Sequence, residues 1–255
     1  MQDQGTVHTT TQNGIATITF SHPAQNSMPG HQLARLAEAI QAAGKDEAVK
    51  LIVLRSGGDR TFCAGASFDE LAAIGDFETG KRFFMGFANV INAMRKCPKL
   101  IVGRVQGKCV GGGIGLAAAT DYCMATKFAT IRLSELAVGI GPFVVGPAVE
   151  RKVGLSAMSQ LAMNPGEWQT AEWARQKGLF SEVFDTLEQL DAYVAHFTEM
   201  LASYNPEALL ELKRIFWTGT EHWDELLEER AGISGRLVLS DFTKNAIAAF
   251  KQKSH

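Results

Sequence analysis

The sequence predicts an α/β fold organised around one strand, a glycine-rich turn and a helix. The apolar run 100–105 leads into the glycine-rich stretch 107–115, and small residues that favour a helix follow it. A second buried strand, 49–54, also runs into a glycine-rich loop, 56–67. From about residue 149 onward the pattern is almost entirely helical. Together these observations predict a mixed α/β body with a helical part at its carboxyl end.

Hydrophobic periodicity indicates the elements of the first half. Alternating apolar and polar residues predict a strand over 14–20, and a proline-containing turn at 22–26 ends it. Two amphipathic helices are expected, with apolar faces made by Leu33, Leu36, Ala37 and Ile40 and by Phe84, Phe87, Ile91 and Met94. Gly44 and Pro98 mark where these two helices end, because both residue types interrupt a helix.

Short strands and helix caps divide the second half. Strands are expected at 122–125, 129–133 and 179–184, and an unusually apolar loop joins the second strand to the helical region. One helix begins near Thr170, and another follows the capping box of Thr186 and Gln189. Asn205 caps a third helix, whose first position is a proline, and two more helices close the chain.

Composition excludes several classes of protein. The chain has 255 residues, a formal net charge of −2 and 46% hydrophobic residues, which is typical of a globular domain and offers no basic surface for nucleic acid. No stretch approaches the roughly 20 apolar residues of a membrane span. The start of the chain lacks the features of a signal peptide, and the four cysteines show no paired spacing, so we expect reduced thiols and a cytoplasmic location. No metal-ligand spacing occurs, and we expect no metal.

Glu135 is the first candidate for chemistry. It lies within 131–138, a segment that is otherwise mostly apolar. A lone glutamate is usually a surface acid or a helix cap, but apolar residues on both sides favour burial here. Burial raises the pKa of a carboxyl group and makes it useful for proton transfer near neutral pH.

The two glycine loops are the second candidate. Each follows a buried strand, with 63–67 after the first and 110–115 after the second. Each loop alone would most simply be a tight turn. Because the two strands are expected to be neighbours, the loops can each direct one backbone N–H at the same oxygen. That arrangement is an oxyanion hole, which stabilises charge that develops on a carbonyl.

A dinucleotide-binding site is the competing interpretation of the central glycines. The stretch 113–118 matches G-x-G-x-x-A, and Glu135 lies near the distance expected for an acid that binds ribose. That fingerprint normally opens a run of alternating strands and helices, whereas this chain soon becomes helical. It also leaves the loop 62–67 without a role.

Taken together, the motifs resemble the crotonase superfamily, also called the enoyl-CoA hydratase/isomerase family, over nearly the whole chain. The opening strand with the turn 22–28 resembles the family's first strand and its proline–asparagine turn, and Phe62-Cys63-Ala64-Gly65-Ala66 is similar to its first oxyanion loop. The stretch 99–113 resembles the family's second oxyanion loop, and 134–142 resembles the segment that carries a catalytic glutamate. Each motif alone is weak, but all of them in this order are specific.

The resemblance implies an α/β spiral of β-β-α units, with a core over 1–200 and a helical part over 201–255 that forms trimers or hexamers. It implies an acyl-CoA substrate, with CoA as part of that substrate and no separate cofactor. The N–H groups of Ala66 and Gly112 would bind the thioester oxygen, and Glu135 would be the acid/base. The implied substrate-binding residues are Ala64, Gly65, Ser67, Gly111, Gly113, Gly115, Ser134, Pro142 and Phe143. The implied CoA-binding residues are Gln25, Asn26, Phe250 and Lys253.

Departures from the family pattern leave the reaction open. Where this chain has Gly115, typical hydratases carry a second glutamate. They also carry an aspartate where this chain has Ser67, and a proline where it has Ser134. A single glutamate most simply catalyses isomerisation, in which one proton is moved between two carbons. The run 113–116 and the apolar loop 140–145 nevertheless resemble the branch of 3-methylglutaconyl-CoA hydratases, several of which also lack the second glutamate.

We therefore expect a hydratase acting on a branched or carboxylated enoyl-CoA. An isomerase is the first alternative, and a non-catalytic acyl-CoA-binding protein is the second. A carboxylated substrate needs a cation near its acyl end, for which Lys81 and Arg82 are the nearest candidates in the sequence. Both residues also fit a solvated helix face.

Overall fold

In the computed structural model, the backbone is described for residues 5–253 and side chains for residues 5–249. The strands are β1 (Thr6–Gln12), β2 (Ile15–Ser21), β3 (Leu51–Ser56), β4 (Thr61–Cys63), β5 (Leu100–Val105), β6 (Lys108–Val110), β7 (Tyr122–Thr126), β8 (Ile131–Arg132) and β9 (Glu182–Phe184). The helices are α1 (Gly30–Lys45), α2 (Phe68–Ala72), α3 (Phe77–Lys96), α4 (Gly112–Ala118), the 3₁₀ helix η1 (Glu135–Val138), α5 (Gly146–Met163), α6 (Ala171–Gln176), α7 (Leu187–Ala202), α8 (Pro206–Phe216), α9 (Trp223–Leu237) and α10 (Asp241–Lys253).

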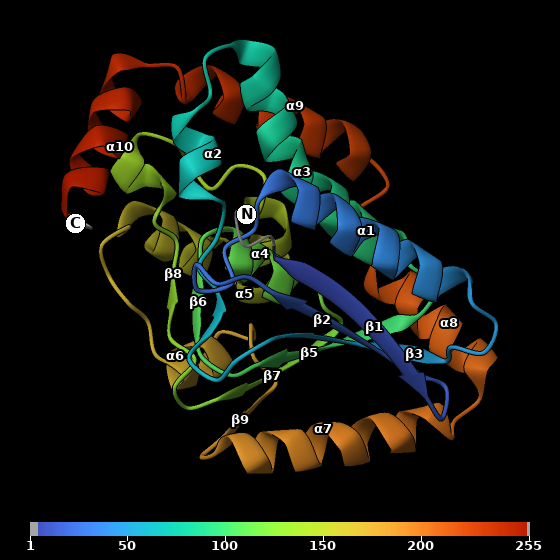
Figure 1. Cartoon of the computed structure of the whole chain (residues 1–255). Coiled ribbons are helices and arrows are strands. Elements are labelled where there is room, and N and C mark those ends of the chain that lie inside the picture. Colours follow the sequence, from blue (N-terminus) through green and yellow to red (C-terminus); the bar gives the residue numbers. More distant parts are fainter. Residues whose placement is uncertain (1–4, 254–255) are drawn as a thin grey trace.

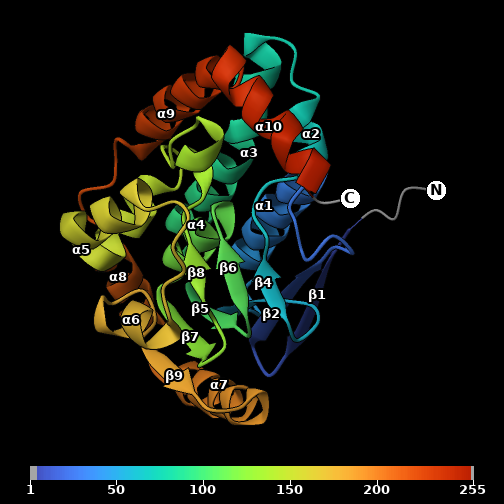
Figure 2. The same cartoon turned by 90° about the vertical axis from the view of Figure 1, so that its left-hand side faces the viewer.

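The strands form two sheets that share a repeating plan. The larger sheet has the order β1-β2-β3-β5-β7-β9 and the smaller has the order β4-β6-β8 (Figures 1 and 2). Three successive strand pairs, β3–β4, β5–β6 and β7–β8, each give their first strand to the larger sheet and their second to the smaller. Neighbouring strands within each set are parallel. The predicted spiral of β-β-α units is therefore present.

The central strands β3 and β5 of the larger sheet are buried on both faces, which explains their largely apolar sequences. In β3, Ile52 and Leu54 face the main core beneath α1 and α3, whereas Leu51 and Val53 pack against α7. Helix α7 lies alone along the opposite face of the sheet (Figure 1). The ends of β3 and β5 are consequently fixed from both sides, and the two glycine loops that follow these strand regions start from rigid positions.

The hairpin of β1 and β2 was only half predicted. Strand 15–21 agrees with the expected strand, but β1 pairs with it antiparallel and was not expected. Its sequence is rich in threonine, and most of its residues are exposed, so it lacks the apolar alternation of a half-buried strand. Asn13 and Gly14 join the strands with φ of 53° and 80°, the left-handed values of a tight hairpin turn.

Helix α9 packs closely against α3 and brings the carboxyl-terminal helices over the body (Figure 2). A methyl group on Gly80 would lie 2.9 Å from the carbonyl oxygen of Gly235, and one on Gly235 would lie 2.6 Å from the nitrogen of Lys81. The backbones therefore touch where the helices cross, and only glycine fits there. Helix α10 also contacts α2 and η1. The division of the chain at residue 200 stays a prediction.

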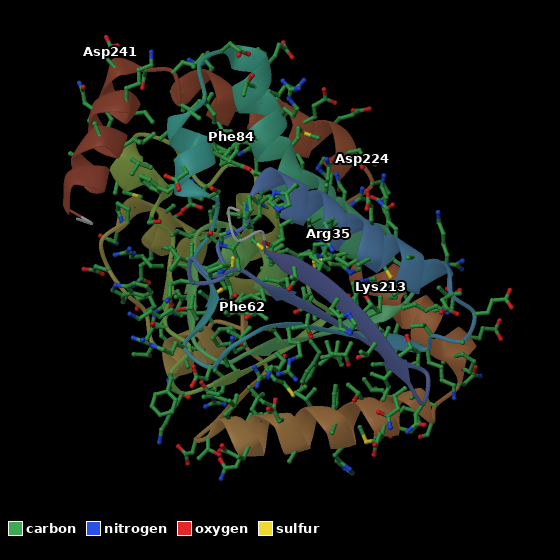
Figure 3. The ribbon with its side chains drawn as sticks, in the orientation of Figure 1. Arg35, Phe62, Phe84, Lys213, Asp224 and Asp241 are labelled. Atoms are coloured by element: carbon green, nitrogen blue, oxygen red, sulfur yellow. The ribbon has the colours of Figure 1, made fainter. Side chains whose placement is uncertain are left out.

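A buried ion pair fixes α8 to the larger sheet. The carboxylate of Asp121, just before β7, accepts hydrogen bonds from Lys213 Nζ at 2.8 Å, from Trp217 Nε1 at 2.7 Å and from Ile101 N at 2.7 Å. Lys213, labelled in Figure 3, and Asp121 both have almost fully buried side chains. The donors surround both carboxylate oxygens, so the pair is well compensated for its loss of water.

Candidate active site

Glu135 opens η1, directly after the end of β8. Its carboxylate lies beneath the second glycine loop, and a methyl group on Gly111 would lie 3.0 Å from Glu135 Oε1. Although the residue as a whole is only half-buried, Oε2 is buried and accepts no hydrogen bond within the described part of the chain. An acceptor without a partner in a buried position is costly for the fold and free to receive a proton.

Burial raises the pKa of Glu135 from 4.5 to about 7. The N–H groups of Glu135 and Ser134 oppose this shift by hydrogen bonding to the carboxylate, but desolvation is the larger effect. The carboxyl group therefore exchanges a proton readily near neutral pH, as expected for an acid/base catalyst. The sequence argument from apolar neighbours is consistent with this result.

The first glycine loop directs the N–H of Ala66 away from its neighbouring strand segment. Met28 N donates to Gly65 O at 2.8 Å, and Ser67 N donates to Met28 O at 3.3 Å. Met28 and Ala66 form a parallel bridge in which Met28 bonds to the residues on either side of Ala66. The N–H of Ala66 therefore points away from Met28. Gly65 has a φ of 92° and passes close to Val110 O, which explains why the loop needs glycine there.

The second loop places the N–H of Gly112 beside the first. Gly111 N donates to Arg132 O at 2.9 Å, and its φ of 51° and ψ of −118° suit glycine alone. Gly112 opens α4, so its N–H has no partner within the helix. A methyl group on Gly65 would lie 3.7 Å from Gly112 N, which shows how close the two loops approach. Over residues 5–253, neither Ala66 nor Gly112 uses its N–H in a hydrogen bond.

A cavity of about 460 Å³ joins these groups. Most of the predicted substrate-binding and catalytic residues line it, namely Ala64, Gly65, Ala66, Gly111, Gly112, Ser134, Glu135, Pro142 and Phe143. Its other walls are largely apolar, with Phe84, labelled in Figure 3, and Phe87 contributed by α3. The sequence had assigned both aromatic residues to the core side of that helix. The cavity can therefore hold an apolar chain between the loops and Glu135.

Three of the predicted substrate-binding residues do not line the cavity. Ser67 instead caps α2 by accepting a hydrogen bond from Glu70 N. Gly113 lies against Cys63, whose Cβ would be 2.7 Å from a methyl group on the glycine. Gly115 packs against Val145, whose Cγ1 would be 2.5 Å from such a methyl group. These three residues shape the site from behind and do not face its interior.

Val145 occupies the space next to Gly115, the position at which typical hydratases carry a second glutamate. It is almost fully buried and fills the space that a side chain at position 115 would need. Among the described residues that line the cavity, Glu135 is the one carboxylate. The described part of the cavity therefore offers a single carboxylate for acid/base chemistry.

The proposed CoA contacts at the first turn have structural roles. Asn26 Nδ2 donates to Gly57 O and Thr61 O, both at 2.8 Å, and Gln25 O accepts a hydrogen bond from Ala64 N at 3.2 Å. The turn therefore anchors the first glycine loop from outside the cavity, and whether it also contacts CoA stays a prediction.

The other predicted contacts lie elsewhere. Phe250 and Lys253 belong to α10, but their side chains are outside the described residues. Lys81 Nζ pairs with Glu228 Oε1 at 2.7 Å. Neither Lys81 nor Arg82 lines the cavity, and Arg82 is exposed, which favours the alternative of a solvated helix face. Sequence reasoning missed Arg132, which does line the cavity.

Comparison with known families agrees with this geometry. The profile described as Enoyl-CoA hydratase/isomerase matches residues 10–254. The chain belongs to this family. The dinucleotide-binding interpretation is thereby overturned, since 113–118 lies inside α4 and its glycines pack against Cys63 and Val145. Across the described residues, no three or more His, Cys, Asp or Glu side chains gather as a metal site, and no helix is long and apolar enough to cross a membrane.

Relatives within the family catalyse different reactions. The chain is 25% identical to a peroxisomal Δ(3,5)-Δ(2,4)-dienoyl-CoA isomerase of Arabidopsis thaliana over 85% of this chain and 82% of that protein. It is 27% identical to the mitochondrial methylglutaconyl-CoA hydratase of Mus musculus over 74% of this chain and 60% of that protein. An enoyl-CoA hydratase from Bacillus halodurans superimposes with a TM-score of 0.88 at 22% identity, over 95% of this chain and 99% of that one. That similarity establishes the crotonase fold, and the family includes both hydratases and isomerases.

Proposed function

We propose that the protein hydrates an α,β-unsaturated acyl-CoA thioester, with a branched or carboxylated acyl group, in fatty or branched-chain acyl catabolism. The observation that supports this proposal is the position of Glu135. Its carboxyl group has a pKa of about 7 and lies beneath Gly111, in the cavity that also receives the two unused N–H groups. No cofactor beyond the CoA of the substrate is required by this chemistry.

The two N–H groups stabilise the negative charge of the reaction. The thioester oxygen binds between the N–H groups of Ala66 and Gly112, where charge accumulates as the thioester becomes enolate-like. Loss of one such donor typically costs about 3 kcal/mol of transition-state stabilisation. Because the donors are held by a β-bridge and by the start of α4, they are oriented before substrate arrives.

Glu135 moves the protons. As a carboxylate it removes a proton from a bound water, and the hydroxide oxygen forms a bond to the β-carbon while the double-bond electrons move toward the thioester oxygen. The protonated Glu135 then returns the proton to the α-carbon, and the thioester carbonyl is restored. One water is added in total, and Glu135 ends in its starting state. A single carboxylate is therefore sufficient when the water lies between it and the double bond.

Isomerisation is the second candidate, and the packing of Val145 against Gly115 favours it. With one carboxylate in the cavity, the simplest reaction removes a proton from the α-carbon of a 3-enoyl-CoA and returns it to the γ-carbon. The same N–H groups would stabilise the enolate. A binding protein without catalysis is the remaining alternative.

A turnover assay with three esters separates these reactions. Crotonyl-CoA, 3-methylglutaconyl-CoA and 3-hexenoyl-CoA are each incubated with the purified protein, and the ultraviolet absorbance of the conjugated enoyl thioester is followed with product masses. Hydration removes absorbance and adds the mass of water to a conjugated ester. Isomerisation increases absorbance from 3-hexenoyl-CoA without a change of mass. Absence of both changes with all three esters would contradict the proposed catalysis.

Glu135→Gln tests the assigned residue. Glutamine preserves the size of the side chain and cannot accept the proton, so turnover is expected to disappear while the affinity for a saturated acyl-CoA is retained. Glu47→Gln, which changes an exposed carboxylate far along the chain, serves as the control for the loss of one charge. Unchanged turnover by Glu135→Gln would contradict the role of Glu135.

We also propose that the protein forms homotrimers, which can pair into hexamers. The support is the family resemblance together with a groove of about 570 Å³ between α5 and α9, next to the exposed Leu155. Light scattering measures the particle mass, and a monomeric mass at micromolar concentration would contradict this proposal.

A further inference from the structure

Arg132 brings a positive charge into the cavity that contains Glu135. It is the last residue of β8, and the preceding residue, Ile131, is fully buried in the main core. Successive side chains of a strand point to opposite faces, so Arg132 extends away from the core. Among the described residues that line the cavity, Arg132 is the one lysine or arginine.

The guanidinium of Arg132 has no acidic partner in the described part of the chain. Its Nε is buried and makes no hydrogen bond, and no ion pair involves this residue. Most other cations near carboxylates are paired, as Lys213 is with Asp121. A buried N–H without an acceptor is costly, and that cost is removed when a ligand supplies the acceptor.

Trp168 holds this guanidinium in place. The guanidinium carbon of Arg132 lies 4.5 Å from the centre of the Trp168 ring, within the range of a cation–π contact. The neighbouring residue Gln169 forms a pair of 2.9 Å backbone hydrogen bonds with Ile131, so the backbone that carries Trp168 is held beside β8. An arginine that is already stacked loses little further freedom when its planar edge receives a carboxylate.

Arg132 is not the counter-ion of Glu135. Burial is the largest effect on the pKa of Glu135 and raises it, whereas hydrogen bonds from two backbone N–H groups lower it. If Arg132 neutralised Glu135, the pKa of the carboxyl group would fall instead of rising. Within the described residues Arg132 and Glu135 form no ion pair, so each is available to a substrate in the cavity that both line.

We propose that Arg132, stacked on Trp168, binds a carboxylate at the acyl end of the substrate and makes the enzyme selective for acyl-CoA esters that carry a second acid group. This inference rests on the proposed function, because it takes the cavity to be the acyl-CoA site. The flat, forked edge of a guanidinium matches the two oxygens of a carboxylate. A neutral acyl chain of the same length would leave that edge without an acceptor.

The test compares two saturated esters that cannot react. Glutaryl-CoA and pentanoyl-CoA have acyl groups of the same chain length, ending in a carboxylate and in a methyl group respectively. Isothermal titration calorimetry measures both dissociation constants for the wild type, Arg132→Gln and Lys108→Gln. Lys108 is an exposed cation 5.6 Å from the same Trp168 ring but outside the cavity lining, so it is a matched control for charge.

We expect the wild type to bind glutaryl-CoA more tightly than pentanoyl-CoA by about 10- to 100-fold, as charge-assisted hydrogen bonds of this kind provide. Arg132→Gln is expected to abolish this preference with little effect on pentanoyl-CoA, and Lys108→Gln to preserve it. Arg132→Lys, which keeps the charge without the flat fork, is expected to retain part of it. Thermal melts of all variants check that each is folded.

Two results would overturn the inference. One is a wild type that binds both esters equally well. The other is an Arg132→Gln variant that loses the same affinity for both, because the guanidinium would then contact the CoA portion that the esters share. Because these measurements need no turnover, a preference for glutaryl-CoA in a protein that hydrates nothing would support Arg132 and refute only the proposed hydratase reaction.

Discussion

Replacing the catalytic candidate should make the protein more stable, and the gain should depend on pH. In the folded protein the pKa of Glu135 is raised from 4.5 to about 7, so the folded state holds the proton more tightly than the unfolded chain. The stabilising effect of that proton is complete below pH 4.5 and is lost as the pH rises through 7. Above that pH the protein keeps a buried carboxylate whose Oε2 has no partner.

The size of the effect follows from the two pKa values. Their difference, from 4.5 to about 7, corresponds to about 3 kcal/mol in the free energy of unfolding. Glutamine does not titrate, so Glu135→Gln escapes this loss. At pH 8 we expect the variant to exceed the wild type by up to about 3 kcal/mol, whereas at pH 5 the advantage shrinks to about 1 kcal/mol or less.

Urea denaturation at pH 5 and pH 8 measures both differences, at one protein concentration so that any assembly contributes equally. For a chain of this length, 1 kcal/mol corresponds to a shift of about 2–4 °C in Tm, so thermal melts provide a second readout. Glu47→Gln changes an exposed carboxylate and should show no such pH-dependent gain. A Glu135→Gln variant whose advantage is the same at both pH values would refute the assignment of a raised pKa to this residue.

Three further predictions concern one N–H donor, the packing behind the cavity and the buried ion pair of α8. Ala66→Pro removes one N–H without adding bulk near Phe87, and should lower kcat by about 10²- to 10³-fold while saturated acyl-CoA still binds; a kcat within threefold of wild type would contradict the oxyanion role. Gly115→Ala should cost about 1–3 kcal/mol in urea denaturation because its methyl group meets Val145, and adding Val145→Ala should recover part of the loss; an unchanged single variant would refute this packing. Asp121→Ala leaves Lys213 charged and buried, and should lower the free energy of unfolding by about 3–5 kcal/mol, whereas a loss below 1 kcal/mol would show that the lysine finds water.

Sequence reasoning located the chemical centre because its signals are local. Glu135 was recognised from the apolar residues beside it, and burial does raise its pKa, although Leu136 is exposed and Gly111 of the second loop lies against the carboxylate. The glycine loops were recognised from glycines that follow apolar strands, and in the structure Gly65 and Gly111 adopt backbone angles that other residues avoid. In both cases the sequence signal lies within a few residues of the group concerned, so the pattern is visible along the chain.

The missed features depend on contacts between distant segments. Arg132 reads as an ordinary polar residue in a short strand, and its importance appears only when Trp168, from the segment between α5 and α6, packs over it. Lys81 looked available in sequence, but its partner Glu228 comes from α9, far along the chain. The three strand pairs repeat in space, but the sequence contains no matching repeat. The neighbours in each sheet come from different pairs, so their pairing is not visible along the chain.

Gly115 and Val145 explain how a one-carboxylate site can be a stable design and not merely a damaged version of a two-carboxylate site. A glutamate lost from an unchanged cavity would leave a polar void, which is costly unless water fills it. Here Val145 occupies the space and joins the main apolar core, so the deep wall of the site is well packed. That apolar wall offers water no hydrogen-bond partner, whereas Glu135 and the two N–H groups do. In the proposed hydration, Glu135 would handle both the reacting water and the proton, and its pKa of about 7 suits proton transfer in either direction.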